Sequence, residues 1–381
     1  MGLRKFKADK IFDGYRFLEG DNVLITDDKG VVEDIVTRSE AGSDFEQFNG
    51  ILSPGFINCH CHLELSHMKG TIPERTGLVK FVVDVVQQRH FPEEQILQAI
   101  EKAEEEMLAN GIVAAGDICN NALTLPQKIK GRIWYHNFIE ASGFNPAIAA
   151  QRFERARNIY EQYSPLGAGG IVPHAPYSVA DELWKLIVHF PGNHLMTIHN
   201  QEIEAENEWF ILKEGALKEL YSAMNIDVSF FKPSGKSSLQ SYLPKFLPGQ
   251  PVILVHNVHT SEEDILFAKR NRQQLYWCLC PNANQYISGQ LPNVDLMIKH
   301  HCEIVLGTDS LASNQQLSIL EEIKTIQKNF PHVEMETMLR WATSNGAKAL
   351  QIDSLLGSFE KGKKPGVVLI ENDNNTSRRL A

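Results

Sequence analysis

The chain has 381 residues, of which 43% are hydrophobic and 22% are charged, and its formal net charge at pH 7 is −10. An acidic chain without a dense run of Lys and Arg is a poor partner for nucleic acid or anionic lipid. No apolar stretch is long enough for a transmembrane helix, and six cysteines are too few for a disulfide framework in a chain of this length. We therefore expect a cytoplasmic globular protein that binds neither nucleic acid nor membrane.

The first fifty residues are short β-type runs separated by polar turns such as the Asp-Asp-Lys-Gly segment at 27–30. Near the other end, residues 362–372 have the pattern of a turn followed by one more strand. We expect residues 1–50 and 355–381 to form together a small β-sandwich domain, with residues 51–354 as a separate, larger domain between them.

Residues 51–354 alternate between strand-like and helical runs. The strand candidates, in chain order, are ILSPGFINCH (51–60), GIVAAGDIC (111–119), RIWYHNFIE (132–140), GGIVPHA (169–175), LMTIHN (195–200), VILVHNV (252–258), QLYWCLC (274–280) and EIVLGTD (303–309). The helical candidates span residues 92–111, 146–163, 179–190, 261–273 and 317–330. Eight strands that alternate with helices predict an α/β protein with a (β/α)8 TIM barrel.

Most of these strand candidates end in a side chain that can do chemistry. These side chains are His60, His62, Asp117, Glu140, His174, His199, His256 and Asp309. Because the active sites of such barrels lie at the carboxyl ends of the strands, we expect these groups to meet there.

His60 and His62 are the first candidates for a metal site. Side chains alternate in direction along a strand, so these two histidines face the same way while the cysteines beside them face the other. Together with His199 and Asp309 they make four donors, which satisfies a catalytic divalent metal. Each alone is more often a structural residue. Zinc is the first choice of metal, with Fe²⁺ and Mn²⁺ as the alternatives.

Glu202 follows three residues after His199. The two can share a site only if the chain leaves the strand at Asn200-Gln201, and a carboxylate beside an activated water is then a natural proton shuttle. The alternative for Glu202 alone is a solvated residue in the acidic run 202–208.

His256 ends the sixth strand candidate and His259 lies just beyond it, and either can stabilise charge as water attacks. His174 stands between two prolines, which suggests the rigid wall of a pocket. A buried structural histidine is the alternative for each. Cys278 and Cys280 lack a second cysteine pair with suitable spacing for a zinc site, so we expect them to be core thiols.

Six motifs in chain order closely resemble the metal-dependent aminohydrolase branch of the amidohydrolase superfamily, which includes deaminases and chlorohydrolases. The motifs are PGFINCHCH, PHAPYSV, TIHNQE, LVHNVHT, CPNAN and GTDSLASN. The resemblance implies one divalent metal bound by His60, His62, His199 and Asp309, since the position of the bridging lysine of dinuclear members is His174 here.

The same resemblance implies catalytic roles for Glu202, as the proton shuttle, and for His256 and Asp309, which would hold the attacking water. It also implies that His174, Asn282 and Ser313 line the substrate pocket.

Two shorter segments, HLELS (62–66) and FIEASGF (138–144), look most like the aminodeoxyfutalosine deaminases. This similarity adds Glu64 and Glu140 as pocket residues and implies hydrolytic deamination of a 6-aminopurine nucleoside such as aminodeoxyfutalosine, adenosine or S-adenosylhomocysteine. Arg75, Arg89 and Arg132 are equal candidates for binding a substrate carboxylate.

Three questions stay open at this point. The same mononuclear site can instead cut an amide or a carbon–halogen bond, and a non-catalytic metal-binding scaffold is a second alternative. We expect a small-molecule substrate as the partner, and a homodimer is left open.

Overall fold

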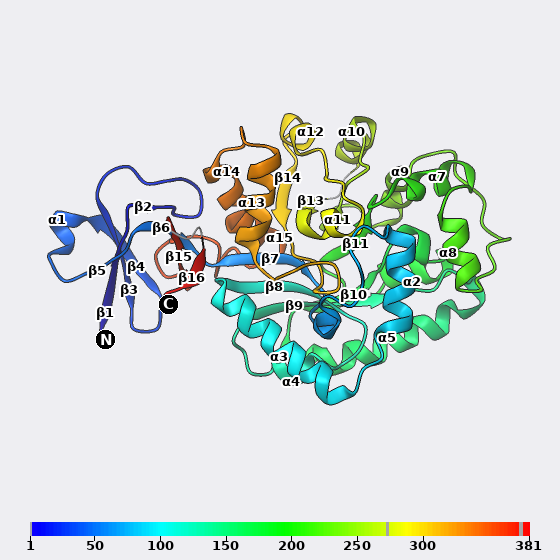
Figure 1. Cartoon of the computed structure of the whole chain (residues 1–381), viewed down its shortest axis with the longest axis horizontal. Coiled ribbons are helices and arrows are strands. Elements are labelled where there is room, and N and C mark those ends of the chain that lie inside the picture. The colour runs from blue at the N-terminus through cyan, green and yellow to red at the C-terminus, as the bar shows by residue number, and fades with distance from the viewer. Residues whose placement is uncertain (1, 272–273, 373–375) are drawn as a thin grey trace.

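The structure is a computed structural model that describes residues 2–271, 274–372 and 376–381. Figure 1 shows two parts: a small β-rich unit near both termini, and a larger body in which helices surround parallel strands. The protein is therefore of the α/β class, as predicted.

Within the described residues, the small unit contains two four-stranded sheets with the orders β4-β3-β1-β5 and β16-β15-β6-β2. The strands of the first sheet are β1 (Leu3–Lys7), β3 (Asn22–Asp27), β4 (Val32–Thr37) and β5 (Glu46–Gln47). Those of the second are β2 (Lys10–Ile11), β6 (Gly50–Pro54), β15 (Val367–Glu371) and β16 (Ser377–Arg379). The one-turn helix α1 (Arg38–Ala41) follows β4.

One buried apolar cluster joins the two small sheets. Phe6 and Leu24 come from the first sheet, and Leu52, Val367 and Leu369 come from the second. Since β6 and β15 pair antiparallel, segments from the two ends of the sequence are held in one sheet, as the β-type runs at both ends predicted.

The predicted strand 51–60 is divided in the structure. Its first part belongs to β6 in the small unit, and its second part is β7 (Phe56–Cys61) in the larger body. Gly55 stands at the crossing, where a Cβ atom would lie 2.3 Å from Val113 Cγ1 and 2.6 Å from Pro365 O. Only glycine fits this close approach, and strand pairing with the small unit continues to Pro54 rather than ending at residue 50.

In the part of the chain that the structure describes, eight parallel strands run through the larger body in sequence order. They are β7, β8 (Ile112–Cys119), β9 (Trp134–Ala141), β10 (Gly169–Pro173), β11 (Met196–Asn200), β12 (Val252–His256), β13 (Leu275–Leu279) and β14 (Glu303–Leu306). They form two sheets, β7 to β10 and β11 to β14.

Backbone hydrogen bonds connect the edges of these two sheets. The His199 amide donates to the carbonyl of His174 at 3.0 Å, and the Thr308 amide donates to the carbonyl of His60 at 3.0 Å. The second contact places the end of β14 beside the end of β7. Residues from the first and the last of the parallel strands therefore lie next to each other.

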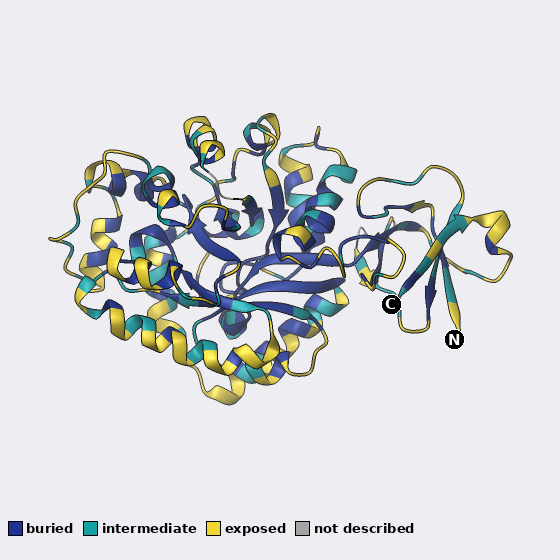
Figure 2. Cartoon of the chain, turned by 180° about the vertical axis from the view of Figure 1, so that it is seen from behind, coloured by how far each residue is buried: buried dark blue, intermediate teal, exposed yellow. Residues whose placement is uncertain are grey.

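Helices cover these strands, and their outer faces are exposed while the strands are buried (Figure 2). The predicted helices are confirmed as α3 (Glu93–Ala109), α5 (Ala149–Tyr163), α6 (Asp181–Val188), α10 (Glu262–Arg270) and α13 (Ile319–Asn329). The last two residues of the predicted helix 261–273 lie outside the described residues. No described helix has the length and apolar character needed to cross a membrane.

The remaining helices were not predicted. They are α2 (Leu78–Gln88), α4 (Leu125–Lys128), α7 (Glu204–Leu212), α8 (Leu217–Ala223), α9 (Ser238–Tyr242), α11 (Pro281–Ile287), α12 (Val294–Lys299), α14 (Met335–Ala342) and α15 (Ser344–Ala349). A second apolar cluster packs α2, α7 and α8 together through residues such as Phe81, Trp209 and Leu220. Helix α2 belongs to the long connection after β7, and α7 and α8 belong to the long connection after β11.

His136 in β9 is buried, and neither of its ring nitrogens has a hydrogen-bond partner among the described residues. Burial lowers the pKa of His136 from 6.5 to about 3, and the charge of His194 acts in the same direction. The unfolded chain therefore binds a proton that the folded protein does not, so the free energy of unfolding falls as the pH drops below about 6.5.

We expect His136→Phe to reduce this acid sensitivity, because the ring then has no group to protonate. The loss of unfolding free energy between about pH 6.5 and pH 4.5 should shrink by on the order of 1 kcal/mol per pH unit, measured by urea unfolding. The exposed His189, changed to Phe, serves as the control and should keep the slope of the unaltered protein. An unchanged slope in His136→Phe would contradict the expectation.

Candidate metal centre

Four side chains from three different strand ends meet at one point. The Nε2 atom of His62 lies 3.2 Å from Nε2 of His60 and 3.3 Å from Nε2 of His199. Asp309 Oδ1 lies 3.5 Å from His60 Nε2 and 3.4 Å from His62 Nε2. All four donor atoms lie within 4.8 Å of one another, and all four residues are buried. The structure thus brings together the residues proposed from sequence as metal ligands.

These separations fit a divalent metal ion. Zinc binds histidine nitrogen at about 2.0–2.1 Å in tetrahedral geometry, so two donors of one ion lie about 3.3 Å apart. Three imidazole nitrogens and one carboxylate form a donor set that suits zinc. A shared cation also accounts for buried ring nitrogens that point at one another.

The imidazoles are prepared to act as neutral ligands. Burial lowers the pKa of His60, and burial together with the neighbouring His174 holds the pKa of His199 well below its usual value. The Nδ1 atom of His199 lies 2.7 Å from the carbonyl oxygen of His174 and donates a hydrogen bond to it. This bond fixes the tautomer of His199 that leaves Nε2 free to bind a cation.

Asp309 follows β14 in the left-handed region, with φ 56°. Burial favours its neutral form, but the hydrogen bond with His60 and the electrostatic attraction of the neighbouring imidazoles outweigh burial and hold its pKa well below the usual value. Ser313 Oγ donates to Asp309 Oδ2 at 2.6 Å. Ser313 does not line the cavity beside the metal site. Its contact orients Asp309, which differs from the pocket role expected from the resemblance.

Glu202 and His256 lie beside the four donors. The chain leaves β11 after Asn200 because Gln201 adopts a left-handed conformation, with φ 46°, and this turn brings Glu202 to the side of His199. Glu202 Oε2 lies 3.6 Å from His256 Nε2. Burial and then the charge of Asp309 raise the pKa of Glu202 well above its usual value. A buried carboxyl group with a raised pKa is suited to carry a proton.

His256 is held by a residue that the sequence did not single out. The side-chain amide of Asn284 in α11 donates to His256 Nδ1 at 3.0 Å, so Nε2 of His256 carries the hydrogen that faces the site. Burial lowers the pKa of His256 to about 3, which keeps the ring neutral. His259 points elsewhere, since its Nδ1 lies 2.8 Å from Oε2 of the exposed Glu204.

Asn282 does not line the cavity, contrary to expectation. Its side chain accepts a hydrogen bond from Thr325, and its backbone amide donates to Glu322 at 2.9 Å. Successive residues of a helix differ in direction by about 100°, so positions 282 and 284 point to nearly opposite sides of α11. The CPNAN motif therefore acts through its second asparagine.

Two carboxylates from different strand ends are bridged by one amide. Asn120 Nδ2 donates to Glu64 Oε1 and to Glu140 Oε2, each at 3.0 Å, and the Asn120 amide nitrogen donates to Glu64 Oε2 at 2.9 Å. Burial raises the pKa of Glu64 to about 7. The other oxygen of Glu140 is buried without a hydrogen-bond partner among the described residues and lies 3.7 Å from His199 Nδ1. Both carboxylates line the cavity, so they offer acceptors to a ligand.

The cavity that contains the metal site has a volume of about 700 Å³. His174 lines it, as expected, with its Nδ1 2.8 Å from Ser178 Oγ. The apolar wall of the cavity includes five residues of α2: Leu78, Phe81, Val82, Val85 and Val86. A volume of this size and an apolar lining with few polar groups are typical of small-molecule sites.

Three arginines also line this cavity: Arg89 after α2, and Arg152 and Arg155 on α5. Of the three sequence candidates for binding a carboxylate, only Arg89 lies there. Arg132 instead bonds to the buried Glu104 at 2.7 Å, and Arg75 is not part of the lining. No signal in the sequence marks Arg152 or Arg155, since charged residues on a surface helix are usually solvated.

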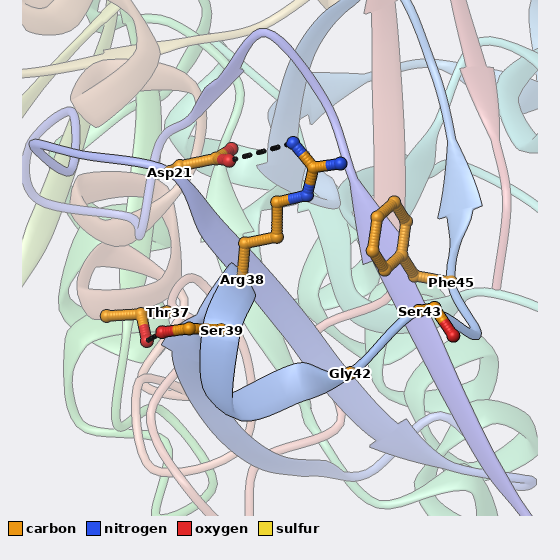
Figure 3. Close-up of a pocket in the computed structure, with 7 residues that line it drawn as sticks. All are labelled: Asp21, Thr37, Arg38, Ser39, Gly42, Ser43 and Phe45. Atoms are coloured by element: carbon orange, nitrogen blue, oxygen red, sulfur yellow. Dashed lines mark hydrogen bonds and ion pairs between the residues drawn. The ribbon is translucent and has the colours of Figure 1, made fainter.

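A second hollow lies on the small unit, away from the parallel strands of the larger body (Figure 3). Arg38 in it faces Asp21 at 3.6 Å and lies over the ring of Phe45, at 5.8 Å from the centroid. Its charged side chains therefore neutralise each other. Cys278 and Cys280 are buried free thiols, as expected, and do not belong to the group of four donors formed by His60, His62, His199 and Asp309.

Comparisons with known proteins agree with this geometry. The chain is 27% identical to a 5-methylthioadenosine/S-adenosylhomocysteine deaminase of Thermoanaerobacter pseudethanolicus, over 85% of this chain and 74% of that protein. The fold of this chain matches the crystal structure of Helicobacter pylori aminofutalosine deaminase in complex with methylthio-coformycin, with a TM-score of 0.82 and 21% identity. The match covers 97% of this chain and 92% of that one.

A Xanthomonas campestris adenosine deaminase with bound zinc matches with a TM-score of 0.73 and 19% identity, over 97% of this chain and 84% of that one. The model of the amidohydrolase family matches residues 51–379, which is most of the chain. The protein therefore belongs to the amidohydrolase family.

Proposed function

We propose that the protein is a metal-dependent hydrolytic deaminase of 6-aminopurine nucleosides. Its catalytic body would be a closed (β/α)8 barrel, with the two terminal sheets as a small β-sandwich, and we place the enzyme in the cytoplasm. One observation carries the proposal. Glu202 and His256 lie beside four convergent metal donors, and neither of them is needed simply to hold an ion.

His60, His62, His199 and Asp309 would hold one divalent ion, zinc by preference. When bound, this ion supplies Lewis acidity that makes water a nucleophile near neutral pH. Asp309 remains ionised and accepts a hydrogen bond from the attacking water, and the Nε2 hydrogen of His256 fixes a lone pair of the same water. The two residues thereby aim the water at the ring carbon that bears the amino group.

Glu202 moves the protons. In its protonated form it gives a proton to the ring nitrogen next to the attacked carbon, which allows the carbon to become tetrahedral. The resulting carboxylate then takes a proton from the attacking water and passes it to the amino group, which leaves as ammonia. The hydroxyl proton of the adduct returns to Glu202 as the carbonyl forms, so the enzyme ends in its starting state.

The cavity supports a nucleoside with an acidic group. Glu64 and Glu140 offer acceptors that suit the hydroxyls of a ribose, and the apolar wall formed by α2 suits a flat or thioether extension. Arg89, Arg152 and Arg155 have no ion-pair partner within 4.0 Å among the described residues, although the chain as a whole is acidic. They favour aminodeoxyfutalosine or S-adenosylhomocysteine over adenosine, which carries no carboxylate.

His199→Ala should lose the metal ion, because it removes one of the four donors that the structure brings together and leaves one side of the ion without a protein ligand. We expect metal content after gel filtration to fall from about one ion per chain to a small fraction of that. Metal content can be measured by inductively coupled plasma mass spectrometry. His189→Ala, at an exposed position, serves as the control. Full occupancy in His199→Ala would contradict its role as a ligand.

Glu202→Gln should bind metal as the unaltered protein does and yet lose deamination. The amide can neither give nor take the proton, so we expect kcat to fall by at least about 100-fold. Ammonia release and the ultraviolet change on deamination measure the activity. A variant with near-normal turnover would remove Glu202 from the mechanism. Release of ammonia from none of a panel of aminopurine nucleosides by the unaltered protein would favour the alternative activity on amide or carbon–halogen bonds.

Arg152→Met and Arg155→Met should weaken the use of nucleosides that carry a carboxylate. A hydrogen bond to a charged group contributes about 1.5–3 kcal/mol, so KM for aminodeoxyfutalosine or S-adenosylhomocysteine should rise about 10-fold or more. KM for adenosine should stay within about twofold.

Arg157→Met is the matched control for these variants. It lies on the same helix, but it pairs with Glu154 and Glu161 and does not line the cavity. Equal effects of Arg155→Met on adenosine and on the carboxylate nucleosides would argue against an anion site.

A further inference from the structure

A buried polar network lies behind the ends of β11 and β12, and the reaction described above does not use it directly. Its members are buried residues of the turn after β11, the turn after β12 and the helices that pack on them: Asn200, Gln201, Asn207, Asn257, Thr260 and Asp264. None of them lines the cavity. Their function must therefore pass through other residues.

Gln201 is the centre of this network, and its side-chain amide is bonded on both sides. Its Nε2 donates to Asn207 Oδ1 at 3.0 Å and to Asp264 Oδ2 at 2.9 Å. Its Oε1 accepts from Thr260 Oγ1 at 2.8 Å. A buried amide with all of these bonds is held in one orientation, because any other rotamer would leave buried polar groups unpaired.

The backbone of Gln201 is held as well. Its amide nitrogen donates to Glu206 Oε1 at 3.0 Å, and its carbonyl oxygen accepts from the His259 amide at 2.9 Å. Asn200 adds a second link between the turns, since its side chain donates to Asn257 Oδ1 at 2.9 Å. The turn after β11 and the turn after β12 are therefore fastened to each other.

Both turns need such support. Gln201, His256 and Asn257 have positive φ values of 46°, 75° and 61°. This conformation is strained for most residues other than glycine, and such residues keep it only where the surroundings hold them. Glu202 follows the first strained residue directly, and His256 is itself strained, so both functional side chains depend on turns that the network fixes.

We propose that Gln201 and Thr260 are positioning residues, which hold the Glu202 carboxyl group against the imidazole of His256. The inference rests on the proposed role of Glu202 in deamination. Thr260 is the link that can be tested with least disturbance, because its hydroxyl touches the amide of Gln201 and neither a metal ligand nor the cavity. Loss of that hydroxyl removes the shorter of two hydrogen bonds to Gln201 Oε1, leaving the 3.4 Å bond from Asn200 Nδ2, and relaxes the turn that carries Glu202.

Thr260→Val removes the hydroxyl and keeps the shape of the side chain. A displacement of a reacting group by about 1 Å costs about 100-fold in rate, so we expect kcat to fall at least about 10-fold. KM should stay within about twofold, and metal content should not change, because neither the cavity nor the ligands are touched. Thr260→Ser keeps the hydroxyl and should restore most of kcat.

Thr26→Val is the matched control. Thr26 is a fully buried threonine in β3 of the small unit, with its hydroxyl 3.0 Å from the carbonyl of Asp27. The Thr26→Val variant lacks a similar buried hydroxyl, and its kcat should equal that of the unaltered protein. Equal kcat values in Thr260→Val and Thr26→Val would overturn the proposal, and so would an equal loss in Thr260→Val and Thr260→Ser.

Two further measurements keep the proposal testable. If Thr260→Val does not fold, Tyr242→Phe removes another donor of the network, the hydroxyl 2.7 Å from Asn200 Oδ1, and should also lower kcat with normal metal content. Normal kcat in a folded Tyr242→Phe protein would then overturn the proposal.

Hydrogen–deuterium exchange separates this proposal from the proposed function. The amides of Gln201 and His259 should exchange faster in Thr260→Val, whereas those of Thr308 and Asp309 should not change. Unchanged exchange at Gln201 and His259 overturns the positioning role even if the unaltered protein deaminates no nucleoside, an outcome that by itself would overturn only the proposed function.

Discussion

The crowding of four buried donors is the interaction on which the rest of the structure depends. Three imidazole nitrogens and one carboxylate oxygen lie within 4.8 Å of one another, with the shortest separations at 3.2–3.5 Å and little access to water. Neutral nitrogens that face each other in this way gain little without a cation between them. Much of the larger body can be understood as the scaffold that holds these donors at the required distances.

The scaffold brings distant residues together by pairing the last parallel strand with the first. Asn58 in β7 forms two hydrogen bonds with Thr308, at 2.8 Å from its amide nitrogen and at 3.0 Å to its amide oxygen. The Asp309 amide also donates to the carbonyl of His60 at 3.1 Å. One buried side chain and one backbone hydrogen bond thus set Asp309 beside His60. A site built on strand ends in this way is more rigid than one built on loops.

Much of the site could be predicted because period-2 alternation and strand-end chemistry are visible in one sequence. His60 and His62 share a face for that reason, and the other donors follow strands that the pattern located well. The failures have equally physical causes. The choice between Asn282 and Asn284 depends on where α11 begins. The sequence does indicate that the chain must leave the strand at Asn200-Gln201 for Glu202 to reach the site, but no glycine reveals the left-handed conformation of Gln201. Arg152 and Arg155 look like ordinary residues of a solvated helix face. The prediction of one strand over residues 51–60 was wrong in one respect. An apolar run does not reveal that the chain passes from one sheet to another at Gly55.

The pairing of β6 with β15 also has a consequence for biosynthesis. Ile51 lies opposite Ile370 in this pairing. During synthesis this edge of β6 therefore stays unpaired until the ribosome has made the chain up to about residue 370. During that time the nascent protein exposes an unpaired, apolar strand edge, which is a template for aggregation. Contacts between such distant positions are also slow to form. Loss of β15 would leave this edge of β6 unpaired, so the small unit can be completed only after the segment around Ile370 has been synthesised.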